Sequence, residues 1–276
     1  MGIVVKQTSK NIITISIALL IGAINTLYFY PEFLRDKYYG LVVFLLATSN
    51  LLQPLMSLGA QHTIIKFYSS FKDKVSRDSF LSSIIFIPLI IIIPVCFFVT
   101  QVHDLIGDFL SIQNPIIESY VWVIFLVAFS TSYFEVFYAW SRVQFKSVFG
   151  NILKEVYPRM AVFVLLVLVS FQIIEKENFV WWLTGLYFIR LLIMILYSFS
   201  LYKPKFSFTL PENFKEIVLY SIYILLAGSA ASLLIDIDKY MIPQKEAISQ
   251  TAYYAVAVFI ATVVEIPGRA MFQIVN

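Results

Sequence analysis

Residues 84–99 read Ile-Ile-Phe-Ile-Pro-Leu-Ile-Ile-Ile-Ile-Pro-Val-Cys-Phe-Phe-Val, without one charged, hydroxyl or amide side chain. A second uninterrupted apolar run occupies residues 162–169. A helix needs ~20 apolar residues to cross a bilayer. Lipid offers backbone groups no hydrogen-bond partners, so such runs are expected to be helical. A β-barrel would instead show alternating segments of ~10 residues. These runs therefore predict membrane-spanning helices.

The composition supports the same conclusion for the whole chain. Of its 276 residues, 60% are apolar and only 13% are charged, and the mean hydropathy is +0.83. Soluble domains average ~45–50% apolar and ~25% charged residues. We therefore do not expect a soluble enzyme, a nucleic-acid-binding protein or a disordered chain. The single cysteine, Cys96, excludes an intrachain disulfide and argues against a thiolate-rich metal site.

Eight stretches are long and apolar enough to cross the membrane. The predicted fold class is therefore all-α, a polytopic membrane bundle of about eight transmembrane helices. The predicted spans are 9–31, 40–64, 79–101, 117–140, 157–174, 179–201, 217–236 and 252–273.

Basic residues alternate between the two sides in a way that predicts the orientation. The side of the N-terminus carries 13 of them, at Lys6, Lys10, Lys66, Lys72, Lys74, Arg77, Arg142, Lys146, Lys154, Arg159, Lys203, Lys205 and Lys215. The opposite side carries five, at Arg35, Lys37, Lys176, Lys239 and Lys245. Lys and Arg collect on the cytoplasmic side, so we expect a cytoplasmic N-terminus.

The seventh and eighth spans echo the first and second. Leu-Leu-Ile-Gly at 19–22 resembles Leu-Leu-Ala-Gly at 225–228, and Tyr-Tyr-Gly at 38–40 resembles Tyr-Tyr-Ala at 253–255. A six-helix repeat keeps the same orientation and gives two lobes related by an axis along the membrane normal. The pattern predicts a two-lobe transporter.

The predicted lobes divide the chain into three parts. Residues 1–201 form the first lobe with spans one to six, 202–216 form a cytoplasmic linker, and 217–276 begin the second lobe with spans seven and eight. The second lobe would then be incomplete at the C-terminus. The alternative is a genuine eight-helix protein.

Ionisable groups at membrane depth are costly, which makes them functional candidates. Arg190 lies near the middle of the sixth span and Glu135 within the fourth. Arg190 either lines a cationic cavity for an anionic headgroup or forms a structural ion pair with Glu135. Glu135 is equally a candidate site for a coupling proton or sodium ion.

Glu265 and Arg269 are four residues apart and share one helix face, with Pro267 between them. They either belong to a moving gate or pair with each other near the helix end.

Asp236 and Asp238 form an Asp-x-Asp pattern, which glycosyltransferases use to hold a metal ion. We expect instead a solvated helix terminus or a cavity mouth, because no nucleotide-binding domain accompanies the pattern. No histidine motif or phosphate-binding loop is present, so neither enzyme activity nor a metal or cofactor is expected.

Three segments resemble the Wzx-type polysaccharide flippases of the multidrug/oligosaccharidyl-lipid/polysaccharide exporter superfamily. They are Tyr-Tyr-Gly at 38–40, leading to Ser-Leu-Gly at 57–59, the basic connection Ser-Arg-Val-Gln-Phe-Lys at 141–146, and Asp-Ile-Asp-Lys-Tyr-Met-Ile at 236–242. The resemblance covers essentially the whole chain. It implies a MATE-like fold, of which these are the first eight helices.

The resemblance also implies a function. The protein would move an undecaprenyl-diphosphate-linked oligosaccharide, such as an O-antigen, capsule or exopolysaccharide repeat unit, across the bacterial plasma membrane. Membrane lipids, an H⁺ or Na⁺ counter-ion, a glycan polymerase and glycosyltransferases are the expected partners. The substrate-binding candidates are Arg190, Arg269, Lys154 and Arg159, and the coupling-ion candidates are Glu135, Asp236 and Glu265.

The sequence leaves two rival functions open. A drug or cation antiporter of the same fold would have an acidic and aromatic cavity, which Arg190 disfavours. A membrane-embedded glycan polymerase or ligase would carry a large outer loop, whereas the predicted outer loops are shorter than ~20 residues.

Overall fold

The computed structural model of the protein describes residues 3–205 and 213–275, and it describes their side chains except at 3–9, 91, 96, 99, 103, 231 and 263–275. Within these ranges the chain forms a bundle of eight helical rods. The rods are α1 (Ile3–Ile24) extended by the π-helical turns of η1 (Asn25–Leu34), α2 (Arg35–Ser57) extended by α3 (Ala60–Phe67), α4 (Lys74–Ser111), α5 (Val121–Val143), α6 (Ser147–Ser170), α7 (Phe179–Leu201), α8 (Phe214–Met241) and α9 (Ser249–Val275). Short 3₁₀ turns join some of them, at η2 (Tyr68–Ser70), η3 (Pro115–Tyr120) and η4 (Ile242–Gln244).

Each predicted span coincides with one rod. Both ends of the sixth span match α7, and the ends of the second are close to those of the α2–α3 rod. Two predicted ends are ten residues off, because α4 continues to Ser111 beyond the predicted end at 101, and α6 begins at Ser147 before the predicted start at 157. Lys154 and Arg159, counted above with a cytoplasmic connection, therefore lie within a helix.

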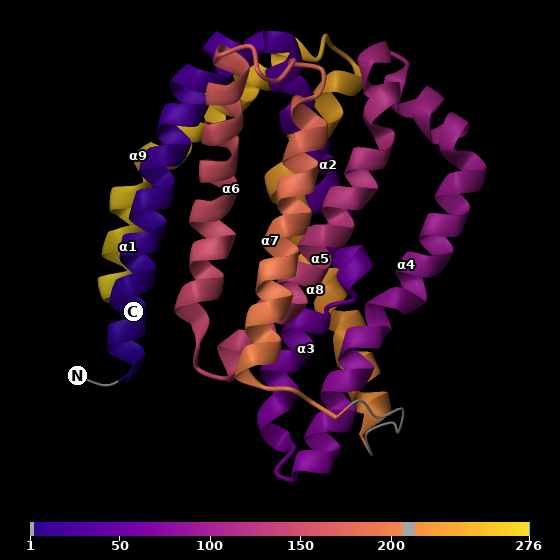
Figure 1. The fold of residues 1–276 in the computed structure, drawn as a ribbon, viewed down its shortest axis with the longest axis vertical. Coiled ribbons are helices and arrows are strands. Elements are labelled where there is room, and N and C mark those ends of the chain that lie inside the picture. Colours follow the sequence, from indigo (N-terminus) through magenta and orange to yellow (C-terminus); the bar gives the residue numbers. More distant parts are fainter. Residues whose placement is uncertain (1–2, 206–212, 276) are drawn as a thin grey trace.

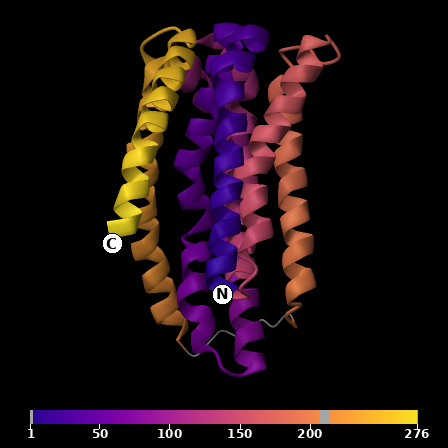
Figure 2. The same cartoon turned by 90° about the vertical axis from the view of Figure 1, so that its left-hand side faces the viewer.

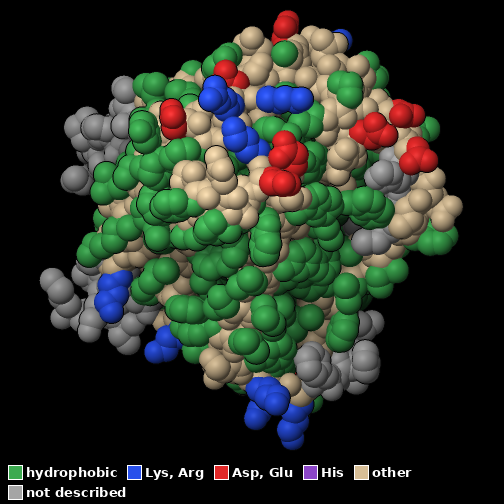
Figure 3. Space-filling model, turned by 45° about the horizontal axis from the view of Figure 1, so that its top comes forward, with side chains coloured by type: hydrophobic (Ala, Val, Ile, Leu, Met, Phe, Trp, Pro, Cys, Tyr) green, Lys and Arg blue, Asp and Glu red, His purple; other side chains and the backbone are tan. Residues whose placement is uncertain are grey.

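The described helices have the apolar character of membrane spans. Four segments are long and apolar enough to cross a membrane, and five if the two bent halves of α8 are counted together. The first of the four covers residues 10–57, which is long enough for two crossings because it joins α1, η1 and α2. The chain is thus a polytopic helical membrane bundle, as the sequence predicts. Apolar side chains also cover much of the face in Figure 3, with charged groups gathered toward its upper and lower ends.

The connections alternate between the two ends of the bundle. The start of α1, the turn between α3 and α4, the turn between α5 and α6, and the end of α7 lie toward the lower end in Figure 1. These are the segments predicted to share the basic side. In Figure 2, α8 and α9 lie on one side of α1 and α2, and α6 and α7 lie on the other.

The α2–α3 rod is broken where it meets α8. Leu58 and Gly59 have φ angles of 49° and 67°, which end α2 and start α3 in a new direction. Glycine adopts a positive φ without a steric penalty. At Gly59 a Cβ would also lie 2.6 Å from a methyl carbon of Ile224 and 2.8 Å from the carbonyl oxygen of Ser221, both in α8. This position therefore permits a close crossing of the two helices.

The side chain of Asn114 fastens the loop between α8 and α9 to the rest of the bundle. The Asn114 amide donates to the carbonyl oxygens of Pro243 at 2.7 Å and Glu246 at 2.9 Å, and its oxygen accepts from the Ile248 amide at 2.8 Å. Buried backbone groups need such partners. The contact fixes α8 and α9 against the turn between α4 and α5.

Candidate functional site

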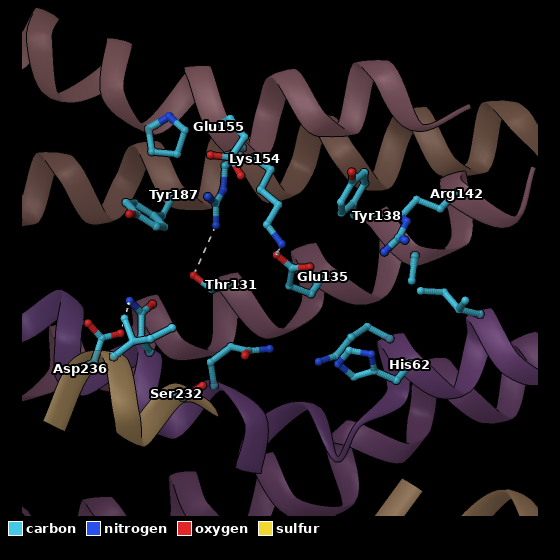
Figure 4. A pocket seen from close by; sticks show the side chains of 18 of the residues that line it. His62, Thr131, Glu135, Tyr138, Arg142, Lys154, Glu155, Tyr187, Ser232 and Asp236 are labelled. Atoms are coloured by element: carbon cyan, nitrogen blue, oxygen red, sulfur yellow. Dashed lines mark hydrogen bonds and ion pairs between the residues drawn. The ribbon is translucent and has the colours of Figure 1, made fainter. Parts of the chain in front are cut away.

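A cavity of about 670 Å³ lies among six helices of the bundle. Its walls combine polar, basic and acidic side chains, several of which point toward one another in Figure 4. The lining residues are Asn50 and Gln53 of α2; Gln61, His62 and Ile65 of α3; Thr131, Glu135, Tyr138, Ala139 and Arg142 of α5; Lys154, Glu155, Pro158 and Arg159 of α6; Tyr187 and Arg190 of α7; and Ser232, Ile235 and Asp236 of α8.

Helical periodicity explains how α5 contributes one continuous wall. Four of its lining residues are spaced by four, three and four positions, so they lie along one face of the helix. They are Thr131, Glu135, Tyr138 and Arg142. The opposite face carries Val136 and Trp140, both fully buried in the packed core. One helix thus packs the bundle and also presents a polar stripe.

Arg190 is the most enclosed basic group of this cavity, with only 4% of its surface exposed. Its Nη2 donates to the Thr131 hydroxyl at 3.3 Å, and its guanidinium carbon lies 4.3 Å from the centre of the Phe134 ring and 4.6 Å from that of Tyr187. The two rings stabilise the cation through their π faces. Its Nε has no hydrogen-bond partner.

The acids of the cavity are paired with other basic residues. Lys154 Nζ lies 2.7 Å from Glu135 Oε1, and Arg159 Nη1 lies 3.1 Å from Glu155 Oε2, one turn away on α6. The alternative ion pair between Arg190 and Glu135 is therefore absent, because Glu135 is held by Lys154. Among the described residues, no carboxylate lies within 4.0 Å of the Arg190 guanidinium.

The cavity is thus a polar chamber inside an apolar bundle, and its most buried arginine lacks a counter-charge among the described residues. The family model described as "Polysaccharide biosynthesis protein" matches residues 4–268. The chain belongs to this family. It is the family of Wzx-type polysaccharide flippases of the multidrug/oligosaccharidyl-lipid/polysaccharide exporter superfamily. Searches of curated proteins and of solved structures gave no match.

Membership in the Wzx-type family agrees with the resemblance seen in the sequence. Its members are flippases rather than enzymes, and lipid-linked polysaccharide and membrane lipids are the ligands that the family implies. Together with the apolar helices, the family assigns this chain to membranes and to polysaccharide biosynthesis.

The structure brings five of the seven candidate site residues of this family member to the same cavity. Arg190, Lys154, Arg159, Glu135 and Asp236 all line it. Lys154 and Arg159 differ from Arg190 because each already has a glutamate partner. The side chains of Glu265 and Arg269 lie outside the described residues.

The sequence left two placements open for Asp236, a solvated helix terminus and a cavity mouth, and the structure places it on a cavity wall and not at a solvated terminus. It is buried within α8, five residues before the end of that helix. Asn50 Nδ2 donates to its Oδ2 at 3.1 Å, and Lys239 Nζ lies 2.6 Å from its Oδ1. Lys239 is likewise part of α8 and not of an outer loop.

Sequence reasoning did not select Arg142 as a site residue. Its guanidinium carbon lies 5.7 Å from the Tyr138 ring centre, and no described carboxylate is within 4.0 Å of it. The signal that could have identified it is its spacing of seven residues from Glu135, which places both on one face of α5. No group of three or more His, Cys, Asp and Glu in the described residues could hold a metal ion.

Proposed function

We propose that this protein flips an undecaprenyl-diphosphate-linked oligosaccharide from the cytoplasmic to the outer leaflet of the bacterial plasma membrane by alternating access. The carried glycan would be an O-antigen, capsule or exopolysaccharide repeat unit. Family membership supports the polysaccharide cargo. Glycosyltransferases would make the lipid-linked oligosaccharide that such a protein carries, and a glycan polymerase would use it after translocation.

The observation that carries the proposal is the burial of Arg190 in the central cavity without a described carboxylate partner. A buried guanidinium without a carboxylate partner is expensive in a low-dielectric interior unless an anion binds there. Its planar fork of N–H groups matches phosphate oxygens in a bidentate manner. Its Nε is buried and has no hydrogen-bond partner in the structure, so a phosphate oxygen that reached it would satisfy an otherwise unpaired donor.

Arg142, the other arginine of the cavity lining without a described carboxylate partner, suggests a path for the headgroup. Arg142 is exposed, near the end of α5, whereas Arg190 contacts Thr131 three turns further into the helix. Eleven residues of helix correspond to about 16 Å. A diphosphate attracted by Arg142 would thus move along the polar stripe of α5 to reach Arg190.

Alternating access requires two bodies that move relative to each other. We assign residues 1–201 to the first lobe, 202–216 to the linker and the chain from residue 217 to the second lobe. The basic segments share one end of the bundle, which supports a cytoplasmic N-terminus. Glu135, Asp236 and Glu265 remain the candidates for coupling to H⁺ or Na⁺.

The rival functions fit the cavity less well. A cation antiporter needs unpaired acidic groups, but Glu135, Glu155 and Asp236 each have a basic partner. A glycan polymerase or ligase of the membrane would place its reactive groups in a large outer loop. The connection between α6 and α7, at residues 171–178, is short.

Replacing Arg190 tests the proposal directly. Arg190→Ala should abolish translocation of lipid-linked oligosaccharide in sealed vesicles at unchanged expression. Arg190→Lys should retain part of the activity, because it keeps the charge but loses the fork geometry. The measurement is the fraction of labelled lipid-linked oligosaccharide that becomes accessible in the opposite leaflet over time.

Arg77→Lys is the matched control. Arg77 is also partly buried, donates to the Phe71 carbonyl oxygen at 3.0 Å and lies over the Tyr68 ring, but it does not line the cavity. Its replacement should leave translocation unchanged. Full translocation by Arg190→Ala would remove Arg190 from the binding site and contradict the proposal.

A further inference from the structure

A second cavity of about 290 Å³ adjoins the central one. Residues from η1, α2, α8 and α9 line it, and most of them are apolar or aromatic. They are Thr26, Tyr30, Tyr39, Val43, Leu46, Ala47, Asn50, Asp236, Lys239, Ala255, Val258, Phe259 and Thr262.

Two residues, Asn50 and Asp236, belong to the walls of both cavities. They contact each other through the 3.1 Å hydrogen bond between Asn50 Nδ2 and Asp236 Oδ2. Lys239 lines only the second cavity and holds the other carboxylate oxygen at 2.6 Å. Figure 4 shows Asp236 at one end of the central cavity, on the far side from Arg142 and His62. We refer to Asn50, Asp236 and Lys239 as the partition.

We propose that the partition separates the two cavities and must open for a polar headgroup to pass from one to the other. The proposed barrier rests on the proposed function only in naming a lipid headgroup as the group that passes it. That the three residues form a barrier is a separate claim, which can be tested without any substrate.

The geometry explains why the barrier is closed and how it opens. Both oxygens of Asp236 have partners, and its side chain is 9% exposed, so the ion pair with Lys239 is shielded from water and screened little. Asn50 lies in α2, within the predicted first lobe, whereas Asp236 and Lys239 lie in α8, at the start of the second. A movement of α8 relative to α2 therefore breaks the hydrogen bond and joins the cavities.

A bend in α8 gives this helix the shape that the contact needs. The two halves of α8 meet at an angle of 47° between Ala230 and Ser232, one turn before Asp236. Gly228, Ser229 and Ala230 precede the bend, and such small residues are common at helix kinks. The half that carries the two charged residues of the partition can thus tilt toward α2 while the other half follows α3.

The sidedness of cysteine labelling tests the partition. In a Cys96→Ser background, Ser232→Cys provides one thiol on the wall of the central cavity only. A membrane-impermeant maleimide is applied to intact spheroplasts and to inverted membrane vesicles. With the partition intact, this thiol should react from one side of the membrane only.

Breaking the partition should make the thiol reactive from both sides. In the double variant Asp236→Asn/Lys239→Gln, labelling from the previously silent side should rise about tenfold, equivalent to ~1.4 kcal/mol of lost closed-state stability. Asn50→Ala removes only the hydrogen bond and should give a smaller rise. An unchanged labelling rate from the first side shows that each variant is folded.

The double variant Glu135→Gln/Lys154→Gln is the matched control. It removes an acid–lysine pair of similar length, 2.7 Å, from the central cavity alone. Its labelling should remain one-sided. Two-sided labelling of the intact partition, no rise in the Asp236→Asn/Lys239→Gln variant, or an equal rise in this control would each overturn the proposal.

Arg190→Ala separates the two claims. This variant should lose translocation and still show one-sided labelling of Ser232→Cys. The labelling experiment can therefore contradict the partition while the translocation assay supports the headgroup site at Arg190. The opposite pair of results would contradict the headgroup site and support the partition.

Discussion

Arg190 is held inside the membrane by weak contacts from neutral groups and not by an ion pair. Two aromatic rings and one hydroxyl surround its guanidinium. Cation–π contacts contribute ~0.5–2 kcal/mol each, so they stabilise the charge without neutralising it. An anion that arrives in the cavity thus meets a full positive charge. This combination of burial and availability distinguishes Arg190 from Lys154 and Arg159.

At the residue scale, Gly40 gives a prediction about packing. A Cβ at this position would lie 2.0 Å from the carbonyl oxygen of Ile248, which is much closer than two atoms can approach. Gly40→Ala should therefore force α2 away from the loop between α8 and α9, and it should cost ~1–3 kcal/mol of stability. Thermal unfolding of the purified protein in detergent measures the loss.

Gly185 in α7 is the control for that substitution. A Cβ there would meet nothing within 4 Å. Gly185→Ala should leave stability unchanged or raise it by up to ~1 kcal/mol, because alanine favours helices more than glycine does. Equal unfolding temperatures for both variants would show that the contact at Gly40 is not tight.

At the scale of a single element, α6 shows why hydropathy misplaced a helix start. Lys154 and Glu155 lie before the predicted start at residue 157, and both line the central cavity. Average hydropathy treats these as loop residues. The helix satisfies its own backbone hydrogen bonds, and its polar side chains line the polar cavity. The helix therefore continues through these polar residues.

The start of α4 gives a prediction about pH. Asp73 caps this helix by accepting a hydrogen bond from the Ser76 amide at 2.7 Å. This hydrogen bond, with help from Arg77, lowers the pKa of the Asp73 carboxyl below its usual value. A carboxyl with a lowered pKa in the folded state stabilises the fold above its ordinary pKa, and the stabilisation is lost as the pH falls through the lowered value. Amide hydrogen exchange at residues 74–78 should therefore accelerate on acidification, beyond the intrinsic pH dependence of exchange.

Two substitutions at Asp73 separate the cap from its charge. Asp73→Asn keeps an oxygen acceptor for the helix start, so protection should persist without the pH response. Asp73→Ala should lose protection at every pH. Identical exchange profiles for Asp73→Asn and the native protein would contradict the assigned role of the carboxylate.

At the scale of the whole molecule, α8 and α9 are anchored to the other helices toward both ends of the bundle. Toward one end, the hydroxyl groups of Thr63 and Ser221 lie 2.7 Å apart and both residues are buried. Toward the other, Asn114 binds the loop between α8 and α9. The partition lies in the same interface. Movement of α8 and α9 as a lobe would therefore exchange a small set of identifiable polar contacts.

The arrangement of the eight rods predicts the side on which each connection lies. Single cysteines that replace Lys72 and Lys203, in the Cys96→Ser background, should be labelled from the cytoplasm. Cysteines that replace Lys176 and Lys245 should be labelled from outside. An impermeant maleimide applied to spheroplasts and inverted vesicles measures both, and the Cys96→Ser parent alone should remain unlabelled.

Two different failures of this experiment would have different meanings. Opposite sidedness at positions 72 and 203 would show that the number of crossings between them is wrong. A complete exchange of the two sides would keep the fold and reverse the orientation inferred from the basic residues.

The sequence by itself determined the environment, the helical class and the family of this protein. Runs such as 84–99 have no stable place outside lipid, and lipid forces a backbone into helices. It also marked Arg190, because an isolated charge within the apolar span 179–201 is conspicuous. These are local properties, which need no knowledge of which helices are neighbours.

Only the tertiary structure decided how the charges are paired. A cavity lining and an ion pair with Glu135 were the two alternatives for Arg190 until α6 placed Lys154 2.7 Å from Glu135. Asn50 and Asp236 are separated by 186 positions in the chain, yet they share one hydrogen bond. Long-range partners depend on the directions in which packed helices face one another, and one helix's own periodicity cannot specify the neighbour across the cavity.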